Sequence, residues 1–598
     1  MTFINIFGTV QSGITNITPL SNYKVSIYYT TLDKPILISE TTSDVKGLFY
    51  FSIDTKNILP ENIYYLVAEL KNIKLLSIIG TKDKLITDIN NLVINELTTI
   101  VTTYCFNNFD LIYGDKKGLI VASLMYYNFV KINGELSDVI KSSPNANQTN
   151  TLQLLNTFSN IISLCIKDYK MFMIVASFTK IIKPIFNTYD IILSIVKNPA
   201  YNVSDIFYTS FVNKIYEPYL DSSNIPQAFT IAVKVNNSGN NDYLIGGPAN
   251  IIFDDEGKAW ITNNVKQGSS DSSNFAIVLL PDGKPSPISP IVNPYIIGQG
   301  FGIVKYFNNV VMGNYGWGNI IPDGGITIYR DDGTPLLKKN FNEYMYRVQG
   351  MTVDIYNNIW ICSTGNGTIV VLLNGSLENI RTLTLPLGSE PFSIRYDNSG
   401  NVVVSVNSLL IKLFINKKNE IEIIFTVDLG SSLLGLTVDD NDNTFVVSFK
   451  SSCVYKVDKY GKLLFTIIGN GISNPWSVTI DEDSSIWVVN FSPNSDNLYA
   501  FTHFSNNGEP LTPSTGYTLP SGGDEVLLAN GEPLNGRGSA PSYQPLMRQT
   551  KCKIDAAGNL WIANNCKPSL FQDTNDNPGG DGICIFIGIA KPNLKNNE

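Results

Sequence analysis

The stretch CKIDAAGNLWIANN, residues 552–565, decides the fold, because weaker copies of it recur through the C-terminal half of the chain. Each full copy is an apolar run ending in Asp, a turn with Gly or Asn, and a second run built on an aromatic or aliphatic residue. That residue stands at positions 260, 311, 360, 403, 445, 487 and 561. The intervals are 42–51 residues, apart from a last interval of 74. A period of about 40–50 residues with several strands per unit predicts a β-propeller.

Each copy can be divided into four strands, a to d, with a second hairpin turn such as PDGK (281–284), DDGT (331–334) or NNGE (506–509) between strands c and d. Asn and Gly in these turns supply the positive φ that tight hairpins need. The last copy has a strand c, ICIFIGI (583–589), but no strand d. FTIAVKV (229–235) has the right alternation and is expected to pair with it and close the ring. This predicts seven blades, or six if the degenerate copy at 302–314 is discarded.

Two other regions precede the repeat. Residues 1–84 alternate apolar and polar side chains over strand-length runs, which predicts a β-sandwich. Residues 85–225 change to a period of about 3.6, which predicts an α-helical domain of about five or six helices. The chain is therefore expected to be a mainly β, multidomain protein, with the propeller over 226–598. A Gly-, Pro- and Ser-rich loop insertion at 508–547 is a candidate for partner contact, with a mobile decoration of the propeller as the alternative.

Three resemblances accompany these patterns. FGTV, PLSNYKVSIYY, TTSDVKGLFYFSID and YYLVAEL follow one another in an order that resembles the carboxypeptidase-regulatory-like sandwiches. That resemblance implies a spacer or docking module. INNLVINELTTIVTTYCF and LLNTFSNIISLC are similar to a helical segment found beside propellers in bacterial proteins. The repeat resembles the NHL family and, more loosely, virginiamycin B lyase-like and gluconolactonase-type propellers.

Composition excludes several classes of function. The 598 residues carry a formal charge of −9 and no long basic run, so no nucleic-acid partner is indicated. The apolar segments are shorter than the roughly 18–20 residues of a membrane span. The start, MTFINIFGTV, has no basic region typical of a signal peptide, so synthesis in the cytoplasm is expected. The seven cysteines are interpreted as free thiols, with a Cys566–Cys584 bridge as the alternative.

The predicted ligand site lies where the b–c and d–a loops of a propeller meet. Carboxamide and carboxylate oxygens there suit Ca²⁺ or a hydroxylated ligand, and gluconolactonase-type propellers hold a divalent ion with such residues. The alternative is that each Asn closes its own turn. No other cofactor and no metal ligand is predicted. The candidate ligand-binding residues are Asn263, Asn264, Asn314, Trp317, Glu390, Asn490, Asn564 and Asn565.

No catalytic residue is predicted. The chain has a single histidine, His503, after strand c of the sixth copy. Virginiamycin B lyase-like mechanisms use histidine near the channel, and this sequence departs from that pattern. Glu96, within an otherwise apolar helix, is either an acid–base group or an interface or capping carboxylate.

Three functions follow as hypotheses. The first is a non-catalytic structural or interaction protein that assembles with protein partners or with itself, as on a virion or other particle surface. The second is a metal-dependent lactonase or lyase at the propeller mouth. The third is a glycan-binding module that uses Trp317 and Trp476.

Overall fold

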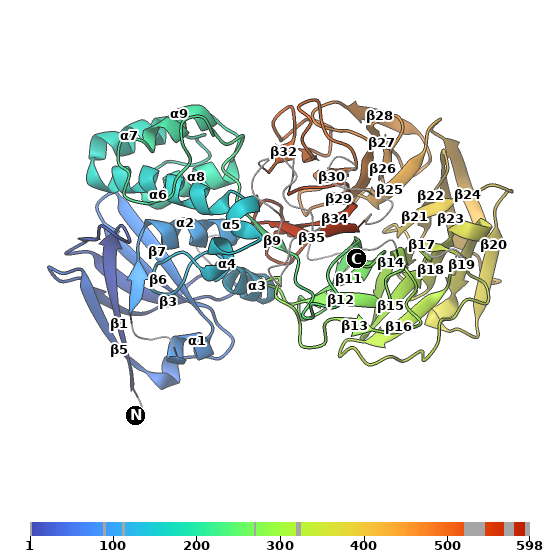
Figure 1. Cartoon of the computed structure of the whole chain (residues 1–598), viewed down its shortest axis with the longest axis horizontal. Helices are drawn as coiled ribbons and strands as arrows, with labels where there is room; N and C mark the ends of the chain where they lie inside the picture. The colour runs from blue at the N-terminus through green and yellow to red at the C-terminus, as the bar shows by residue number, and fades with distance from the viewer. Residues whose placement is uncertain are drawn as a thin grey trace. The chain divides into compact units, whose positions relative to one another are not determined.

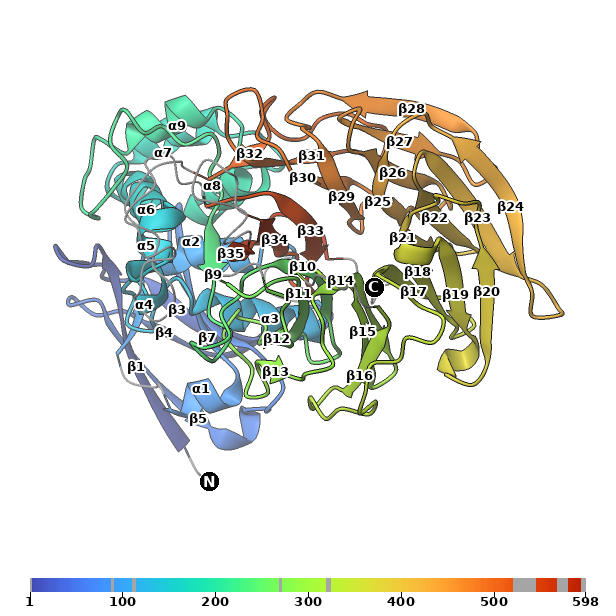
Figure 2. The ribbon, with the colours of Figure 1, turned by 45° about the vertical axis from the view of Figure 1, so that its right-hand side comes forward.

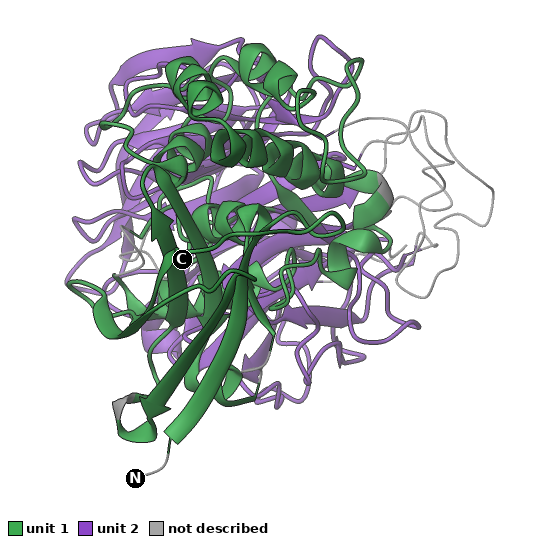
Figure 3. Cartoon of the chain, turned by 90° about the vertical axis from the view of Figure 1, so that its left-hand side faces the viewer, with its two compact units in different colours: residues 1–233, 555–560, 586–592 green, residues 234–554, 561–585, 593–598 purple. Residues whose placement is uncertain are grey.

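The computed structural model describes residues 3–87, 91–109, 114–267, 271–318, 324–519, 545–566 and 579–592. It divides into two compact units (Figure 3). The first holds Met1–Val233 together with Asp555–Leu560 and Phe586–Pro592, and the second holds Lys234–Ile554 and Trp561–Ile585. Most of the predicted insertion at 508–547 lies outside the described residues.

Two four-stranded sheets begin the first unit (Figure 1). One has the order β2-β1-β5, with β8 parallel to β1, and the other has the order β4-β3-β6-β7. Alternate residues of β5, namely Phe49, Phe51 and Ile53, share one hydrophobic core with Val25 and Leu66 of the other sheet. The strands are β1 (Phe3–Ser12), β2 (Thr18–Pro19), β3 (Lys24–Tyr29), β4 (Ile36–Thr42), β5 (Leu48–Asp54), β6 (Tyr64–Leu70), β7 (Ile73–Gly80) and β8 (Leu92–Ile94).

The helices of the first unit follow these sheets. The described residues hold nine, and α1, α4 and α5 are short, which accounts for the prediction of only five or six. A capping box starts α2, with Asn95 and Thr98 bonding each other's backbone. The helices are α1 (Lys82–Thr87), α2 (Glu96–Cys105), α3 (Lys116–Tyr126), α4 (Asp138–Lys141), α5 (Asn145–Gln148), α6 (Thr151–Lys167), α7 (Tyr169–Phe178), α8 (Thr188–Lys197) and α9 (Val203–Thr209). None of the described helices is long and apolar enough to cross a membrane.

The second unit is built from antiparallel sheets that follow one another along the chain, seven of them in its described residues. The first three have the orders β10-β11-β12-β13, β14-β15-β16 and β17-β18-β19-β20. Their strands are β10 (Pro248–Phe253), β11 (Ala259–Asn263), β12 (Phe275–Leu279), β13 (Ile291–Val292), β14 (Gln299–Tyr306), β15 (Asn309–Asn314), β16 (Ile326–Arg330), β17 (Val348–Val353), β18 (Ile359–Ser363), β19 (Thr368–Leu372) and β20 (Ile380–Thr384). The degenerate copy at 302–314 thus belongs to a sheet of its own, β14-β15-β16.

The remaining sheets have the orders β21-β22-β23-β24, β25-β26-β27-β28, β29-β30-β31-β32 and β33-β34-β35-β9. The predicted strand in 229–235 is β9, which is the fourth strand of the last sheet as expected. The strands are β9 (Ala232–Val235), β21 (Pro391–Tyr396), β22 (Val402–Val406), β23 (Leu409–Ile415), β24 (Ile421–Asp428), β25 (Leu433–Val438), β26 (Thr444–Ser448), β27 (Cys453–Val457), β28 (Leu463–Ile468), β29 (Pro475–Ile480), β30 (Ile486–Asn490), β31 (Ala500–Phe504), β32 (Tyr517–Thr518), β33 (Gln549–Ile554), β34 (Leu560–Cys566) and β35 (Gly579–Phe586).

The first strands of these sheets form a closed circuit. Each adjoins the first strand of the next sheet, from β10 through β14, β17, β21, β25 and β29 to β33, and β33 adjoins β10 again. The last strands, such as β20, β24 and β28, lie at the outer edge (Figure 2). Hydrophobic clusters fill the space between neighbouring sheets, as where Trp260 of β11 packs with Met312 of β15. A closed circuit of radiating antiparallel sheets is the propeller fold that the repeat predicts.

The turn Asp of the repeat holds its own hairpin together. The carboxylate of Asp354 accepts hydrogen bonds from the backbone of Tyr356 and Asn358, each at 2.9 Å, and from the indole of Trp360 at 2.7 Å. Asp254 and Asp481 bond their Trp residues in the same way. The recurring Asp and Trp therefore stabilise the fold.

All seven cysteines are free thiols in the structure. Cys566 and Cys584 are among them, so the alternative of a bridge between these two is not formed.

Candidate functional site

The predicted Asn residues lie at the ends of second strands and are buried. In Asn263 the side-chain oxygen accepts from the backbone N–H of Gly247 at 2.8 Å, and the amide group donates to the carbonyl of Val265 at 2.9 Å. Asn314, Asn490 and Asn564 likewise accept a backbone N–H from the loop that enters their own sheet. These contacts are those of residues that close turns, and their role as ligand-binding groups stays a prediction.

The structure brings together two of the predicted residues from opposite ends of the repeat. The amide group of Asn565, in β34, donates to the side-chain oxygen of Asn264 and to the carbonyl of Pro248 at 3.0 Å. Both Asn side chains are about 5% exposed, so they join the last sheet to the first and present little surface.

Trp317 and Glu390 occupy separate loops. The Trp317 ring stacks on Tyr315 with centroids 4.5 Å apart, and among the described residues its buried indole N–H has no hydrogen-bond partner. Glu390 is exposed, and its backbone N–H donates to the side chain of Asn407 at 2.7 Å. The described contacts do not join either residue to the buried Asn residues. In the described residues no group of three His, Cys, Asp or Glu side chains is placed to hold a metal ion.

His503 is bonded to a serine that is bonded to an aspartate. Its Nε2 lies 2.5 Å from Oγ of Ser485, which donates to Asp481 at 2.7 Å. The imidazole stacks on Trp487 with centroids 3.8 Å apart, and burial lowers its pKa to about 3. In a catalytic triad the acid orients the histidine and the histidine activates the serine. Here the acid bonds the serine, both of them in the turn between β29 and β30, and His503 lies on the neighbouring strand β31.

Aromatic side chains meet at the centre of the strand circuit. Phe301 of β14, Phe392 of β21 and Trp476 of β29 lie with ring centroids 5.6–5.8 Å apart. Phe449 and Phe491 pack against Trp476 from outside this group. Because the first three come from alternate sheets, they close the centre of the circuit at the end where the first strands begin. Trp476 is therefore part of this plug.

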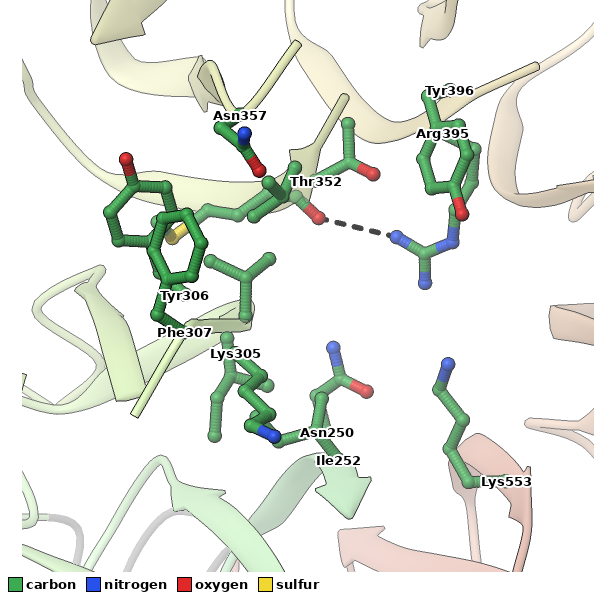
Figure 4. A pocket seen from close by; sticks show the side chains of 14 residues that line it. Asn250, Ile252, Lys305, Tyr306, Phe307, Thr352, Asn357, Arg395, Tyr396 and Lys553 are labelled. Atoms are coloured by element: carbon green, nitrogen blue, oxygen red, sulfur yellow. Dashed lines mark hydrogen bonds between the residues drawn. The ribbon is translucent and has the colours of Figure 1, made fainter. Parts of the chain in front are cut away.

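A cavity of about 260 Å³ lies on the other side of the plug, toward the turn Asp residues. Figure 4 shows the side chains that line it. A smaller cavity adjoins it and reaches the plug, and the two share Asn250, Met351 and Arg395. In Figure 4 the side chains of Asn250, Arg395 and Lys553 point toward the same open space. The sequence placed its candidate site at the Asn residues, whereas this cavity opens at the opposite end of the first strands.

The lining follows from the alternation of side chains along the first strands. Most of the residues two and four positions before the turn Asp line the two cavities. The two positions hold Asn250 and Ile252 in β10, Gly350 and Thr352 in β17, Ser393 and Arg395 in β21, Gly435 and Thr437 in β25, Ser477 and Thr479 in β29, and Lys551 and Lys553 in β33. In β14 the position of the turn Asp is occupied by Lys305, which also lines the cavity. The sequence marks these lining positions in SIRYD (393–397) and CKIDA (552–556), where a basic residue interrupts an otherwise apolar run.

The charged side chains among the described lining residues of the two cavities are basic. Lys305, Arg395, Lys551 and Lys553 line them, and no Asp or Glu is among the described lining residues. Lys305 pairs with the exposed Asp255. The guanidinium of Arg395 donates to the carbonyls of Met351 at 3.2 Å and Ile394 at 2.9 Å, which holds it in place.

No model of a protein family matches the sequence, and no curated protein matches it either. Several solved structures are similar in fold. An inactive virginiamycin B lyase from Staphylococcus aureus shares 14% identity over 60% of this chain and 99% of its own, with a TM-score of 0.40. A streptogramin B lyase shares 14% identity over 60% of this chain and 97% of its own, with a TM-score of 0.42. The WD40 propeller domain of Doa1 shares 13% identity over 45% of this chain and 86% of its own, with a TM-score of 0.33. These neighbours are propellers.

Proposed function

We propose that the chain is a non-catalytic structural or interaction protein that assembles through its domains with protein partners or with copies of itself. In this proposal a seven-bladed NHL-like propeller over 226–598 follows a carboxypeptidase-regulatory-like sandwich over 1–84 and a helical domain over 85–225. The closed circuit of first strands and the pairing of β9 with β35 support seven blades. The two sheets around one core support the sandwich.

The observation that carries the proposal is the exposed apolar surface of two outer strands. β24 and β28 are last in their sheets, and in the described residues no further strand pairs with their outer edges. Ile423 and Ile424 of β24 are exposed, as are Leu463, Leu464 and Ile468 of β28. Edge strands with exposed aliphatic side chains are templates for another chain, and native proteins usually cover or charge them.

The test is the mass of the protein in solution and in its native source. Light scattering on a size-exclusion column is expected to give a mass above the 66.1 kDa of one chain, or a complex with a partner. Ile424→Lys combined with Leu464→Lys is expected to reduce that mass, because charged side chains on an edge oppose strand pairing. Leu387→Lys, in an exposed loop, is the matched control. A monomer at every concentration, with no partner recovered from the native source, would reject the proposal.

The more specific ideas from the sequence keep the status of hypotheses. A virion or particle location is tested by locating the protein in purified particles. Ca²⁺ binding at the Asn residues is tested by calorimetry with CaCl₂, and glycan binding by a glycan array with Trp317→Ala as the control.

A further inference from the structure

We propose that α7 and the loop that follows it, residues 169–186, dock on the surface of a membrane that contains anionic lipids. This segment is called the α7 surface below. It is separate from the outer strands β24 and β28, on which the proposed assembly depends, so the two proposals can fail independently.

The α7 surface exposes apolar side chains, whereas the exposed face of a surface helix usually carries polar ones. In α7 the side chains of Phe172 and Val175 are buried and pack inward. In Figures 1 and 2 α7 lies on the side of the helices that faces away from the two sheets. Groups of exposed apolar side chains mark surfaces that contact a partner or a membrane. The exposed apolar side chains are Tyr169, Met173 and Ile174 in α7 and Ile181, Ile182 and Phe186 in the loop.

Hydrogen bonds to α8 hold the backbone of the loop in place. The carbonyl of Lys180 accepts from the hydroxyl of Ser194 at 2.5 Å, and the backbone N–H of Phe186 donates to the carboxylate of Asp190 at 3.0 Å. The ammonium group of Lys183 lies 3.0 Å from the same carboxylate. The exposed side chains of the loop are therefore presented on a fixed backbone, which lowers the entropic cost of docking.

The charge of this segment favours an anionic membrane. Residues 167–186 hold four Lys and one Asp, although the whole chain carries −9. The one acid, Asp168, caps α7 by accepting a hydrogen bond from the backbone N–H of Lys170 at 2.8 Å. Lysine side chains near an anionic leaflet are attracted to it, and lysine beside exposed apolar side chains is typical of segments that lie at a membrane interface. The four are Lys167, Lys170, Lys180 and Lys183.

The length and composition of the α7 surface favour the surface of a membrane over its interior and over a protein partner. The ten residues of α7 are too few for a span, which takes roughly 18–20 residues. Interfaces between proteins are depleted in Lys, whereas interfacial membrane segments are rich in it. Tyr169 adds a ring of the kind that is enriched at the level of the lipid headgroups. An anionic lipid surface is the occupant that fits these observations together.

Cosedimentation of the full chain with lipid vesicles tests the proposal. The natural protein is expected to bind vesicles of phosphatidylcholine and phosphatidylglycerol more strongly than vesicles of phosphatidylcholine alone, and added salt is expected to reduce the difference. Ile181→Asp combined with Phe186→Asp is expected to weaken binding about tenfold or more, because charged groups would replace the side chains that enter the lipid. Leu32→Asp combined with Val45→Asp makes the same change of charge at exposed residues of the first unit and is expected to leave binding unchanged.

Three results would overturn the proposal. The first is a natural protein that binds neither kind of vesicle, and the second is equal binding by the two double variants. The third is a fall in the mass of the Ile181→Asp, Phe186→Asp protein in lipid-free solution with no change in its vesicle binding, which would assign the α7 surface to a protein contact.

Hydrogen exchange of the natural protein provides a measurement that needs no variant. With vesicles that contain phosphatidylglycerol, exchange is expected to slow in residues 169–186 and to stay unchanged in β24 and β28. Exchange that is unchanged in residues 169–186, or that slows only in β24 and β28, would overturn the proposal.

Discussion

In the copies that contain Asp397 and Asp439, the Trp that bonds the turn Asp is missing, and a Lys on the next strand takes over its role. In their copies the Trp position is Val403 or Phe445, so no indole N–H reaches the carboxylate. Lys412 and Lys456 lie directly across the ladder from these two residues. Their ammonium groups lie 2.6 and 3.5 Å from the Asp carboxylates. A buried donor to the turn Asp is thereby kept in both sheets.

Lys412→Met is therefore expected to destabilise the protein strongly. Both side chains of the Lys412–Asp397 pair are at most 5% exposed, and removing one partner of a buried pair typically costs about 3–5 kcal/mol. Denaturant unfolding followed by tryptophan fluorescence measures the change, with the exposed Lys417→Met as control. A loss below about 1 kcal/mol, the range of an exposed pair, would contradict the structural role given to Lys412.

His503 is expected to stay neutral in the folded protein at all moderately acidic pH values. Burial lowers its pKa to about 3, against about 6.5 in an unfolded chain. Below pH 6.5 the unfolded state binds a proton that the folded state does not. The contribution of His503 to stability is therefore complete above that value and declines as the pH falls toward 3. Because the chain has one histidine, its imidazole NMR signals can be followed without assignment; a midpoint between pH 6 and 7 would contradict the buried position.

At the scale of elements, the carboxyl group of Glu96 joins three segments of the first unit. It stands at the start of α2 and accepts hydrogen bonds from the hydroxyl of Ser12 at the end of β1, from the backbone of Gly13 at 3.2 Å, and from the hydroxyl of Tyr216 at 2.5 Å. The side chain is fully buried. These contacts are those of the interface carboxylate that the sequence allowed as one reading of Glu96.

Burial raises the pKa of Glu96, although the hydrogen bonds lower it in part. The folded state therefore keeps a proton at pH values where an unfolded Glu, with a pKa of about 4.3, has lost it. The contribution of this group to stability is highest below about pH 4 and decreases as the pH rises above that value. The Gln side chain in Glu96→Gln cannot ionise. The free energy of unfolding of this variant is therefore expected to rise relative to that of the natural protein as the pH increases from 4 to 8. A difference in free energy of unfolding between the two proteins that stays constant over this pH range would contradict the raised pKa.

At the scale of the whole second unit, the circuit of strands depends on contacts between its last and first sheets. The amide group of Asn565 supplies several of these, to Asn264 and to the carbonyls of Gly247 and Pro248. Asn565→Leu would remove the amide donor from the side-chain oxygen of Asn264 and the carbonyl of Pro248, at a cost of about 1–3 kcal/mol each, whereas the carbonyl of Gly247 keeps the backbone N–H of Asn264.

The variant is expected to lower the thermal midpoint and to raise hydrogen exchange in β10 and β33. Asn314→Leu, a buried Asn that bonds only within its own sheet and entry loop, is the matched control. Equal exchange in β10 for the two variants would show that Asn565 does not hold the circuit closed.

The repeat could be recognised in the sequence because Asp354 and Trp360 act within one hairpin, and a hairpin is encoded by neighbouring residues. A local pattern also predicted β9, because apolar and polar residues alternate over 229–235, just before the first copy. The candidate site was harder to predict. Nothing in the sequence shows that Asn263 bonds Gly247, so the Asn residues were predicted to be available to a ligand. Arg395 was not among the predicted site residues.

The sequence by itself determined the propeller fold, because its strands and turns depend on local pattern and on a period that repeats. Only the tertiary structure decided what lies at the centre. Asn250, Arg395 and Lys553 are far apart in the chain and meet because closing the circuit brings their first strands around one cavity. Convergence of this kind depends on how the sheets are arranged around the circuit, which the order of residues does not show.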